Sequence, residues 1–370
     1  MGVGSVLIVG GGIAGLTAAA ALGRTGVRCE VVDLTGGAEG SGLGVQNRGI
    51  DALHAIGALD EVVAIGAAYD QAPLRFFDAA GDLVSAPPVP PRPDGKPSYL
   101  IVYRPRLAEI LRRCAERAGA TVRIGVSIDR LDQHADRVDV GFTDGTRGSY
   151  DLVVGADGLR STVRRMVFGD EVRPLSTGTV SLRWLPVGAP RGEAGFYYGQ
   201  DTEMVVVPMH DDMTYVSVQH PDDSLLSDAE GRALLRKKFE QFSSPYLTAL
   251  ARGLTDDQSV LVRRYEWLMV DGPWHRGRVV LIGDAAHATT AHLGSGGVMA
   301  LEDAVVLAEE IASGEPLEVL LDRFHSRRFP RCHTVVETSV RLSGMQRDGA
   351  SADEMGAVRW PALQLLSRPY

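Results

Sequence analysis

Three short apolar runs, widely spaced along the chain, are each followed by glycine. They comprise Val6 to Val9, Leu152 to Val154 and Val279 to Ile282. Each run is too short for a helix and has the continuous apolar character of a strand buried on both faces. Such strands are typical of parallel sheets, so the pattern predicts an α/β fold whose main sheet the chain leaves and rejoins twice.

The stretch from Gly178 to His220 has a different pattern, in which apolar and polar residues alternate. Thr214 to Val218 shows it most clearly, as expected of a sheet with one buried and one solvated face. Ser227 or Asp228 is a suitable N-cap for the next helix. The periodicity predicts helices over 47–63, 228–242 and 299–311, and another from 317 onward.

These patterns divide the chain into three parts. Residues 1–175 are predicted to form a Rossmann-type dinucleotide-binding domain with small inserted strands at about 70–100. Residues 176–265 are predicted to form a mainly antiparallel sheet that binds substrate. Residues 266–370 return to the first domain and end in helices.

The first apolar run leads into a glycine-rich turn. Gly10, Gly12 and Gly15 follow the G-x-G-x-x-G spacing, and Asp33 ends the next strand. Gly10 makes the tight turn, Gly12 lets the backbone approach a pyrophosphate, and Gly15 allows close helix–strand packing. Asp33 is placed to bond a ribose hydroxyl and would repel a 2′-phosphate, so FAD or NAD is expected and NADP is not.

The other two apolar runs also lead to an acid, Asp157 after the second and Asp284 after the third. Ligands of open α/β sheets bind beyond the carboxyl ends of the strands. Three such ends indicate one extended ligand that passes all of them. FAD is long enough to pass all three strand ends, whereas NAD alone would not need the third strand end.

Composition restricts the class of protein. The net charge of -9 argues against nucleic acid or an anionic membrane as the main partner. Cys29, Cys114 and Cys332 are far apart and predict neither a disulfide framework nor a zinc site, so a reducing cytoplasm is expected. The sequence has no apolar run of membrane-spanning length and no signal-peptide pattern, so no membrane span is expected.

Three ordered motifs together carry a family resemblance. They are the glycine-rich start, the stretch from Asp157 to Ser161 and the stretch from Gly283 to His287. In this combination the chain resembles the single-component FAD-dependent aromatic hydroxylases, the p-hydroxybenzoate hydroxylase-like flavoprotein monooxygenases, from Val6 to roughly Gly344. The resemblance implies a Rossmann-type FAD-binding domain, an inserted substrate sheet and C-terminal helices.

The resemblance also implies which residues bind FAD. The ADP part is assigned to the first motif, with Asp33 on the ribose, and Arg104 is assigned to the flavin side. Asp157 and Gly158 are linked to both FAD and the nicotinamide cofactor, and Asp284 is assigned to the ribityl chain. The remaining cofactor contacts comprise Gly10, Gly12, Ile13, Ala14 and Gly15 in the first motif, and Gly294, Gly296, Gly297 and Val298 before the helix predicted over 299–311.

The loop before that helix departs from the family pattern. The family commonly has proline, glutamine and asparagine there, whereas this chain has Ala291, Ser295 and Val298. Backbone N–H groups can still stabilise the anionic reduced flavin, but side-chain amides are lost.

The implied reaction begins when NADH or NADPH reduces FAD. Oxygen then adds to the reduced ring as a C4a-hydroperoxide, and an electron-rich aromatic carbon attacks the terminal oxygen. Because the flavin carries this chemistry, no metal is required, and the protein has to place a small aromatic substrate and exclude water. A monomer or a homodimer is expected.

Substrate contacts are expected from the middle sheet. Glu203 or His220 could act as the base for a phenol, and Arg183 would suit a carboxylate on the ring. Tyr198 and Gln219 are further candidates. His287 is expected to have a structural hydrogen-bonding role, whereas His292, nearer the flavin loop, is equally compatible with a place in the site.

Two alternatives stay open at this point. An FAD-dependent oxidase or reductase on the same fold would keep the three motifs but yield no oxygenated product. A non-catalytic NAD-binding regulatory protein would have the glycine motif, no reason to carry Asp157 and Asp284, and no colour when purified.

Overall fold

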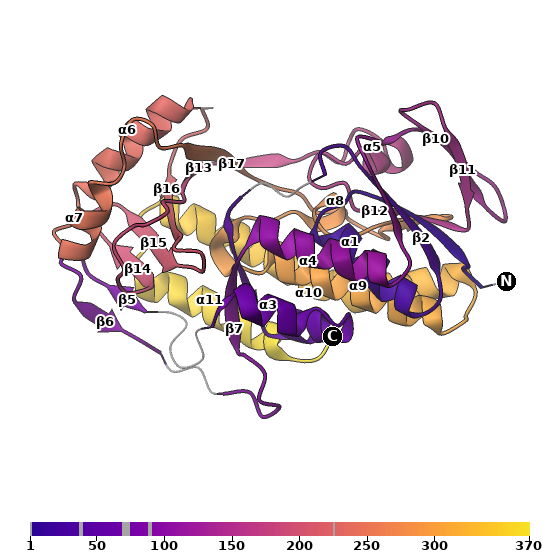
Figure 1. The fold of residues 1–370 in the computed structure, drawn as a ribbon, viewed down its shortest axis with the longest axis horizontal. Coiled ribbons are helices and arrows are strands. Elements are labelled where there is room, and N and C mark those ends of the chain that lie inside the picture. The colour runs from indigo at the N-terminus through magenta and orange to yellow at the C-terminus, as the bar shows by residue number, and fades with distance from the viewer. Residues whose placement is uncertain (1, 37–39, 69–74, 88–90, 225) are drawn as a thin grey trace.

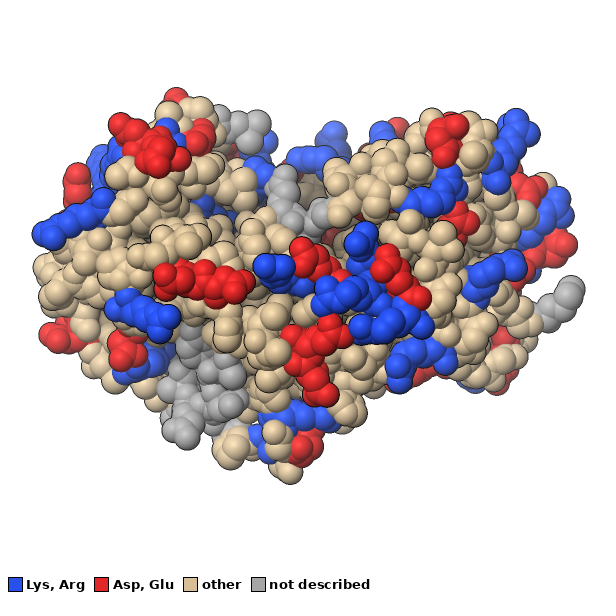
Figure 2. Space-filling view, in the orientation of Figure 1, with Lys and Arg blue, Asp and Glu red and all other residues tan. Residues whose placement is uncertain are grey.

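The computed structural model describes residues 2–36, 40–68, 75–87, 91–224 and 226–370. Two large sheets lie side by side along the long axis of the molecule, and long helices run beneath them (Figure 1). This arrangement confirms the predicted mixed α/β fold class. On one face of the molecule, acidic and basic side chains are intermingled, and a notch separates the two halves along the upper edge (Figure 2).

The first sheet has six strands in the order β18-β19-β12-β1-β2-β8. The three apolar runs lie next to one another in it: Val6 of β1 is paired with Leu152 of β12, and Val153 of β12 with Val279 of β19, all in parallel. The carboxyl ends of these strands therefore meet at one edge. The strand bounds are β1 Ser5–Val9, β2 Arg28–Asp33, β8 Thr121–Ile124, β12 Leu152–Gly155, β18 His275–Arg276 and β19 Val279–Leu281.

Helices and two small sheets surround this sheet. Helix α1 (Ile13–Arg24) packs against both α4 (Arg104–Arg117) and α9 (Gly296–Ala312). Further elements here are α5 Thr162–Phe168, the sheet of β9 Ile128–Gln133, β10 Val138–Phe142 and β11 Arg147–Tyr150, and the sheet of β3 Gly42–Gln46, β4 Ala67–Ala68 and β7 Tyr99–Tyr103.

The single helix expected over 47–63 was wrong, because the structure has two helices there. Helix α2 (Arg48–Ala55) ends before Gly57, whose φ of 71° lies in the left-handed region, and α3 (Leu59–Ile65) comes next. A glycine in this conformation ends a helix at little cost.

The second sheet has seven strands in the order β17-β13-β16-β15-β14-β5-β6, antiparallel except for the β14–β5 pair. Two strands of this sheet, β5 and β6, lie in the stretch where small inserted strands were expected, at about 70–100. Within that stretch, residues 70–74 and 88–90 lie outside the described residues. The second sheet thus includes residues well before 176. Its strands are β5 Phe76–Phe77, β6 Leu83–Ser85, β13 Leu175–Trp184, β14 Gly195–Tyr198, β15 Glu203–Pro208, β16 Thr214–His220 and β17 Val260–Trp267.

Two helices cover one face of this second sheet, at the left end of Figure 1. They are α6 (Asp228–Phe239) and α7 (Pro245–Ala251), which pack on inward residues such as Trp184 and Val216. Ser227 caps α6 in a capping box with Glu230. The opposite face carries Arg183 and Tyr215 and borders the cavity that is described below.

The chain ends in a helical region that connects the two sheets. Helix α10 (Leu317–Arg347) contacts both α9 and β13, and α11 (Ala352–Ser367) packs back along it. The remaining elements here are α8 Asp284–His287 and the short η1 Ala291–Leu293. Among the described residues, no helix is both long and apolar enough to cross a membrane.

Candidate functional site

A cavity of about 340 Å³ opens where the first sheet's carboxyl edge faces the second sheet. Its walls come from the glycine turn after β1, from β3, from the segment after β12, from the segment between α8 and α9, and from β13, β16 and β17. The three motifs of the resemblance and the middle sheet thus border one space.

The glycine turn fits tightly against its neighbours at two positions and is open at a third. A Cβ at Gly10, where φ is 112°, would lie 2.3 Å from the carbonyl oxygen of Ala156, and one at Gly15 would lie 1.9 Å from that of Gly10. A Cβ at Gly12 would meet nothing within 4 Å. Gly12 lines the cavity together with Ile13 and Ala14, so backbone N–H groups at the start of α1 are open to an anion.

Asp33 ends β2 beside this turn. Its carboxylate accepts hydrogen bonds from the backbone N–H groups of Gly11 at 2.8 Å, Thr35 at 2.9 Å and Gly36 at 2.7 Å. Partial burial opposes ionisation, but these hydrogen bonds outweigh it and lower the pKa of Asp33. The ionised carboxylate therefore fixes the shape of the glycine turn.

Arg104 lies in the cavity wall at the start of α4. Its Nε is buried and has no hydrogen-bond partner within the described part of the chain. A buried guanidinium donor without an acceptor is costly unless a ligand supplies one. The position thus fits an acceptor-rich ligand such as FAD.

The two acids that come after glycine have different surroundings. Asp157 accepts hydrogen bonds from Ser161 Oγ at 2.5 Å and from the Thr162 N–H at 2.7 Å, so it caps α5, and its burial raises its pKa. Gly158 lines the cavity, whereas Asp157 is not among the lining residues. Asp284 is exposed to the cavity at the start of α8.

The segment before α9 supplies backbone to the cavity. Gly294, Gly296 and Gly297 line it, and Gly294 has a φ of 60°. Ser295 Oγ donates to the carbonyl of Leu293 at 2.9 Å, and Val298 is buried against Gly49. Two of the departures from the family pattern, Ser295 and Val298, are therefore satisfied by contacts within the protein.

Arg183 is the substrate-side candidate that reaches the cavity. It lies in the wall with Tyr215 and Tyr265, and its Nε donates to Ser181 Oγ at 3.1 Å. Burial opposes its charge, but interactions with the two tyrosines keep its pKa raised. Neither tyrosine was identified from the sequence as a site residue. The alternation of polar and apolar residues around Tyr215 did indicate that its side chain lies on one face of a sheet.

Glu203 and His220 lie on opposite faces of the sheet, because side chains alternate along a strand. Glu203 shares the Arg183 face with Tyr198 and Gln219, is outside the cavity lining, and has a raised pKa through burial. His220 lies on the α6 side with Lys238, and burial lowers its pKa. The structure does not bring His220 to the cavity.

The fold and the cavity together define a protein of the nucleotide-binding α/β class with a second, mainly antiparallel sheet beside the cavity. The family model of an FAD binding domain matches residues 4–339. The chain is 30% identical to 3-amino-4-hydroxybenzoate 2-monooxygenase of Streptomyces cremeus, over 91% of this chain and 86% of that protein. It is 28% identical to an FAD-dependent urate hydroxylase of Klebsiella oxytoca, over 89% of this chain and 87% of that protein.

Solved structures agree on the fold. Klebsiella pneumoniae HpxO, complexed with FAD and uric acid, superposes with a TM-score of 0.80 at 24% identity, over 99% of this chain and 97% of that one. The chain belongs to the FAD-dependent monooxygenases of the aromatic hydroxylase family, and FAD is its cofactor. The predicted family, enzyme class and FAD cofactor are confirmed.

Proposed function

We propose that this enzyme uses NADH or NADPH and O2 to hydroxylate a small, electron-rich aromatic or heteroaromatic compound that carries an acidic group. The observation that carries the proposal is Arg183, a partly buried cation in the cavity wall that forms no ion pair with a carboxylate of the described residues. A partly buried cation without a counter-charge favours an anionic ligand. Urate and 3-amino-4-hydroxybenzoate, in the names of the two relatives, are both acidic.

The rest of the cavity suits FAD. Gly12 and the start of α1 would hold the pyrophosphate, Asp33 would support the ribose end, and Asp284 would bond the ribityl hydroxyls. Arg104 would approach from the flavin side. When bound and reduced, the flavin supplies the oxygen-transfer chemistry.

The substrate ring would lie between the flavin and the second sheet. Arg183 would anchor the acidic group, while Tyr215 and Tyr265 would flank the ring and keep water out. Glu203, with its raised pKa and an Oε2 that lacks a partner among the described residues, would hydrogen-bond a more distant polar group of the substrate. We assign no substrate contact to His220, because it lies on the α6 face.

The nicotinamide cofactor would bind transiently, since the sequence has only one glycine-rich dinucleotide motif. Gly158 lies in the cavity wall, and Asp157 bonds the backbone of the residues that follow it. Both residues are proposed to contribute to the transient binding of the nicotinamide cofactor as well as to FAD binding. A monomer or a homodimer is compatible with this reaction.

The decisive experiment measures oxygen-dependent NADH and NADPH oxidation across hydroxybenzoates, hydroxypyridines, purines and neutral phenols, with product mass. Stimulation by an acidic ring together with a product one oxygen heavier supports the proposal. A yellow protein that oxidises NAD(P)H and never oxygenates a ring would favour the oxidase or reductase alternative. A protein that cannot be loaded with FAD would contradict every flavoenzyme function.

Arg183→Gln tests the acidic group. We expect KM for the acidic substrate to rise about tenfold to a hundredfold, because a charge-assisted hydrogen bond is lost, with FAD content unchanged. Arg191→Gln, at a side chain that is 87% exposed, is the matched control and should keep the wild-type KM. An unchanged KM in the Arg183 variant would exclude the proposed anion pairing.

A further inference from the structure

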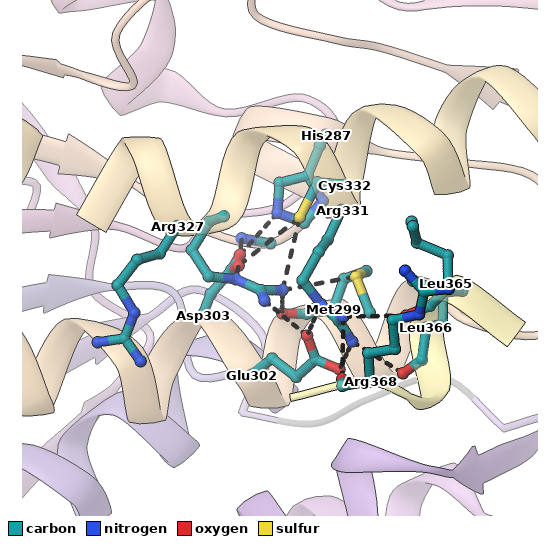
Figure 3. Close-up of polar contacts among 12 residues, drawn as sticks. His287, Met299, Glu302, Asp303, Arg327, Arg331, Cys332, Leu365, Leu366 and Arg368 are labelled. Carbon is teal, nitrogen blue, oxygen red and sulfur yellow. Dashed lines mark hydrogen bonds and ion pairs between the residues drawn. The ribbon is translucent and has the colours of Figure 1, made fainter. Parts of the chain in front are cut away.

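Residues of α8, α9 and α10 form a cluster of buried charged side chains (Figure 3), which is connected to Gly283, the residue before Asp284. It consists of His287, Glu302, Asp303, Arg328 and Arg331, none of which is more than 7% exposed. Charges buried this deeply are tolerated only when they are paired and hydrogen-bonded. The contacts of the cluster therefore indicate what holds this part of the molecule in shape.

Asp303 is the centre of the cluster. Its Oδ2 accepts the N–H of Gly283 at 2.8 Å and lies 2.6 Å from His287 Nε2, and its Oδ1 accepts from Arg328 Nε at 2.8 Å. Burial acts against the charges of both residues. Cys332 and Asp303 nevertheless hold the pKa of His287 well above its usual range, and His287 and Arg328 hold the pKa of Asp303 below its own, at about 2. Both carboxylate oxygens of Asp303 are therefore in use as hydrogen-bond acceptors.

The contact with Gly283 connects the cluster to the cavity. Gly283 has a φ of 59°, immediately precedes Asp284, and would place a Cβ only 2.9 Å from Ala14 Cβ of α1. Asp303, which is fully buried and does not line the cavity, holds the N–H of this turn immediately before Asp284.

The other half of the cluster ties down the end of the chain. Arg328 donates to Glu302 at 2.6 Å, and Arg331 donates to Glu302 at 3.0 Å. Arg331 also donates to the carbonyl oxygens of Leu366 at 2.9 Å and Arg368 at 3.2 Å (Figure 3). These carbonyls end α11, where the helix dipole is negative, so they offset the excess of three cations over two carboxylates.

A metal ion does not explain this arrangement. Ligand atoms of His287, Asp303 and Cys332 lie within 4.8 Å of one another, the one such group among the described residues. However, Arg328 donates to Asp303, and Nη2 of Arg328 lies 3.6 Å from Cys332 Sγ, so a guanidinium already supplies the positive charge. The cluster is built for hydrogen bonding between protein groups.

We propose that Asp303 is a positioning residue for FAD, which acts through Gly283 to aim Asp284 at the cofactor. The proposal rests on the proposed ribityl contact of Asp284 and is independent of which compound is hydroxylated. Arg331 belongs to the same cluster but bonds Glu302 and the carbonyls at the end of α11, so it should not control the aim of Asp284.

Asp303→Asn is the direct test. An amide offers one acceptor atom where the carboxylate offers two, so Gly283 or Arg328 loses its partner. We expect the Kd for FAD, measured on apoprotein without substrate, to rise about tenfold, with altered circular dichroism of the bound flavin. Arg331→Gln is the matched control: it should lower the apoprotein Tm but leave the Kd for FAD within about twofold of wild type.

A double-mutant cycle with Asp284→Ala separates positioning from general stability. If Asp303 acts through Asp284, Asp303→Asn weakens FAD binding about tenfold in the wild-type background and hardly at all in the Asp284→Ala background. Additive losses, an unchanged Kd for Asp303→Asn, or an equal loss in Arg331→Gln would overturn the proposal. Should Asp303→Asn not fold, Arg328→Lys replaces it in the cycle, because lysine cannot bond Glu302 and Asp303 in the same forked geometry. A failure of the substrate proposal would leave these FAD measurements unaffected.

Discussion

His292 shows how a single residue near the site responds to burial. Its Nδ1 lies 2.7 Å from Thr290 Oγ1, its Nε2 lies 3.1 Å from Gln346 Oε1, and the edge of its ring meets Tyr265. Burial lowers the pKa of His292 from 6.5 to about 4, so the ring is neutral at neutral pH. The next residues, Leu293 and Gly294, lead into the segment before α9 that lines the cavity.

This pKa predicts a pH dependence of stability. Between pH 6.5 and about 4 the unfolded chain binds a proton at His292 that the folded protein does not, so the free energy of unfolding falls as the pH falls. From about pH 7 to about pH 5 this one group should remove about 2 kcal/mol. His292→Gln should lack that part of the decline in urea unfolding, whereas His54→Gln, at an exposed position, should match the wild-type curve. Parallel curves for wild type and His292→Gln would contradict the prediction.

Asp157 and Asp284 show the limit of reading single residues from sequence. Both come after a buried strand and a glycine, yet one caps α5 and the other faces the cavity. The difference comes from the neighbouring residues: Ser161 and Thr162 begin a helix that turns back onto Asp157, whereas Asp284 itself begins α8. Sequence placed both at the right edge of the sheet but could not show where each carboxylate points.

At the scale of elements, two glycines of the turn and the start of α1 have different roles, one in packing and the other at the ligand cavity. Gly15 packs directly on the backbone of the turn, whereas Gly12 faces open space at the cavity. The same substitution at the two positions should therefore have different consequences.

Gly15→Ala should destabilise the apoprotein by about 3 kcal/mol or more, because its Cβ has no room against the Gly10 carbonyl. Gly12→Ala should leave the apoprotein Tm near that of wild type and weaken FAD binding, because the added methyl group stands where the pyrophosphate approaches. Thermal unfolding of the apoproteins and FAD titration check both. Equal effects of the two variants on the stability of the apoprotein would contradict the assignment of Gly15 to packing and of Gly12 to ligand binding.

Helix ends were predicted unevenly. The sequence predicted a cap at Ser227 or Asp228 because such residues before a helix are a local signal, and the structure shows that the cap is Ser227. The break between α2 and α3 was missed because apolar spacing continues across Gly57. The helix predicted from 317 onward also proved to be two, with α11 starting anew at the capping box of Ser351.

At the scale of the whole molecule, one cavity joins parts of both sheets. Its walls include Gly12 from the first sheet's edge, Arg183 from the second sheet and Gly296 at the start of α9. A ligand that fills this space contacts segments of both sheets and the start of α9 at once, so it should stabilise the folded state as a whole.

FAD should therefore raise the Tm of the apoprotein in a concentration-dependent way. At a free concentration about one hundred times its Kd, linkage predicts about 2.7 kcal/mol of added stability. ADP, which would reach the proposed pyrophosphate site at the glycine turn but not the flavin side of the cavity, should give a smaller increase at the same concentration. Thermal scans with each ligand check this, and a Tm that does not respond to FAD would contradict binding in this cavity.

The sequence by itself determined the buried parallel strands, the glycine turn, the FAD family and the helical end of the chain. These depend on local rules, since apolar periodicity and backbone freedom at residues such as Gly10 act over a few positions. Tertiary structure alone decided that Arg183 and His220 face opposite ways, that β5 and β6 join the second sheet, and that Asp303 reaches Gly283. Those features depend on contacts between residues far apart in the chain, which no local pattern encodes.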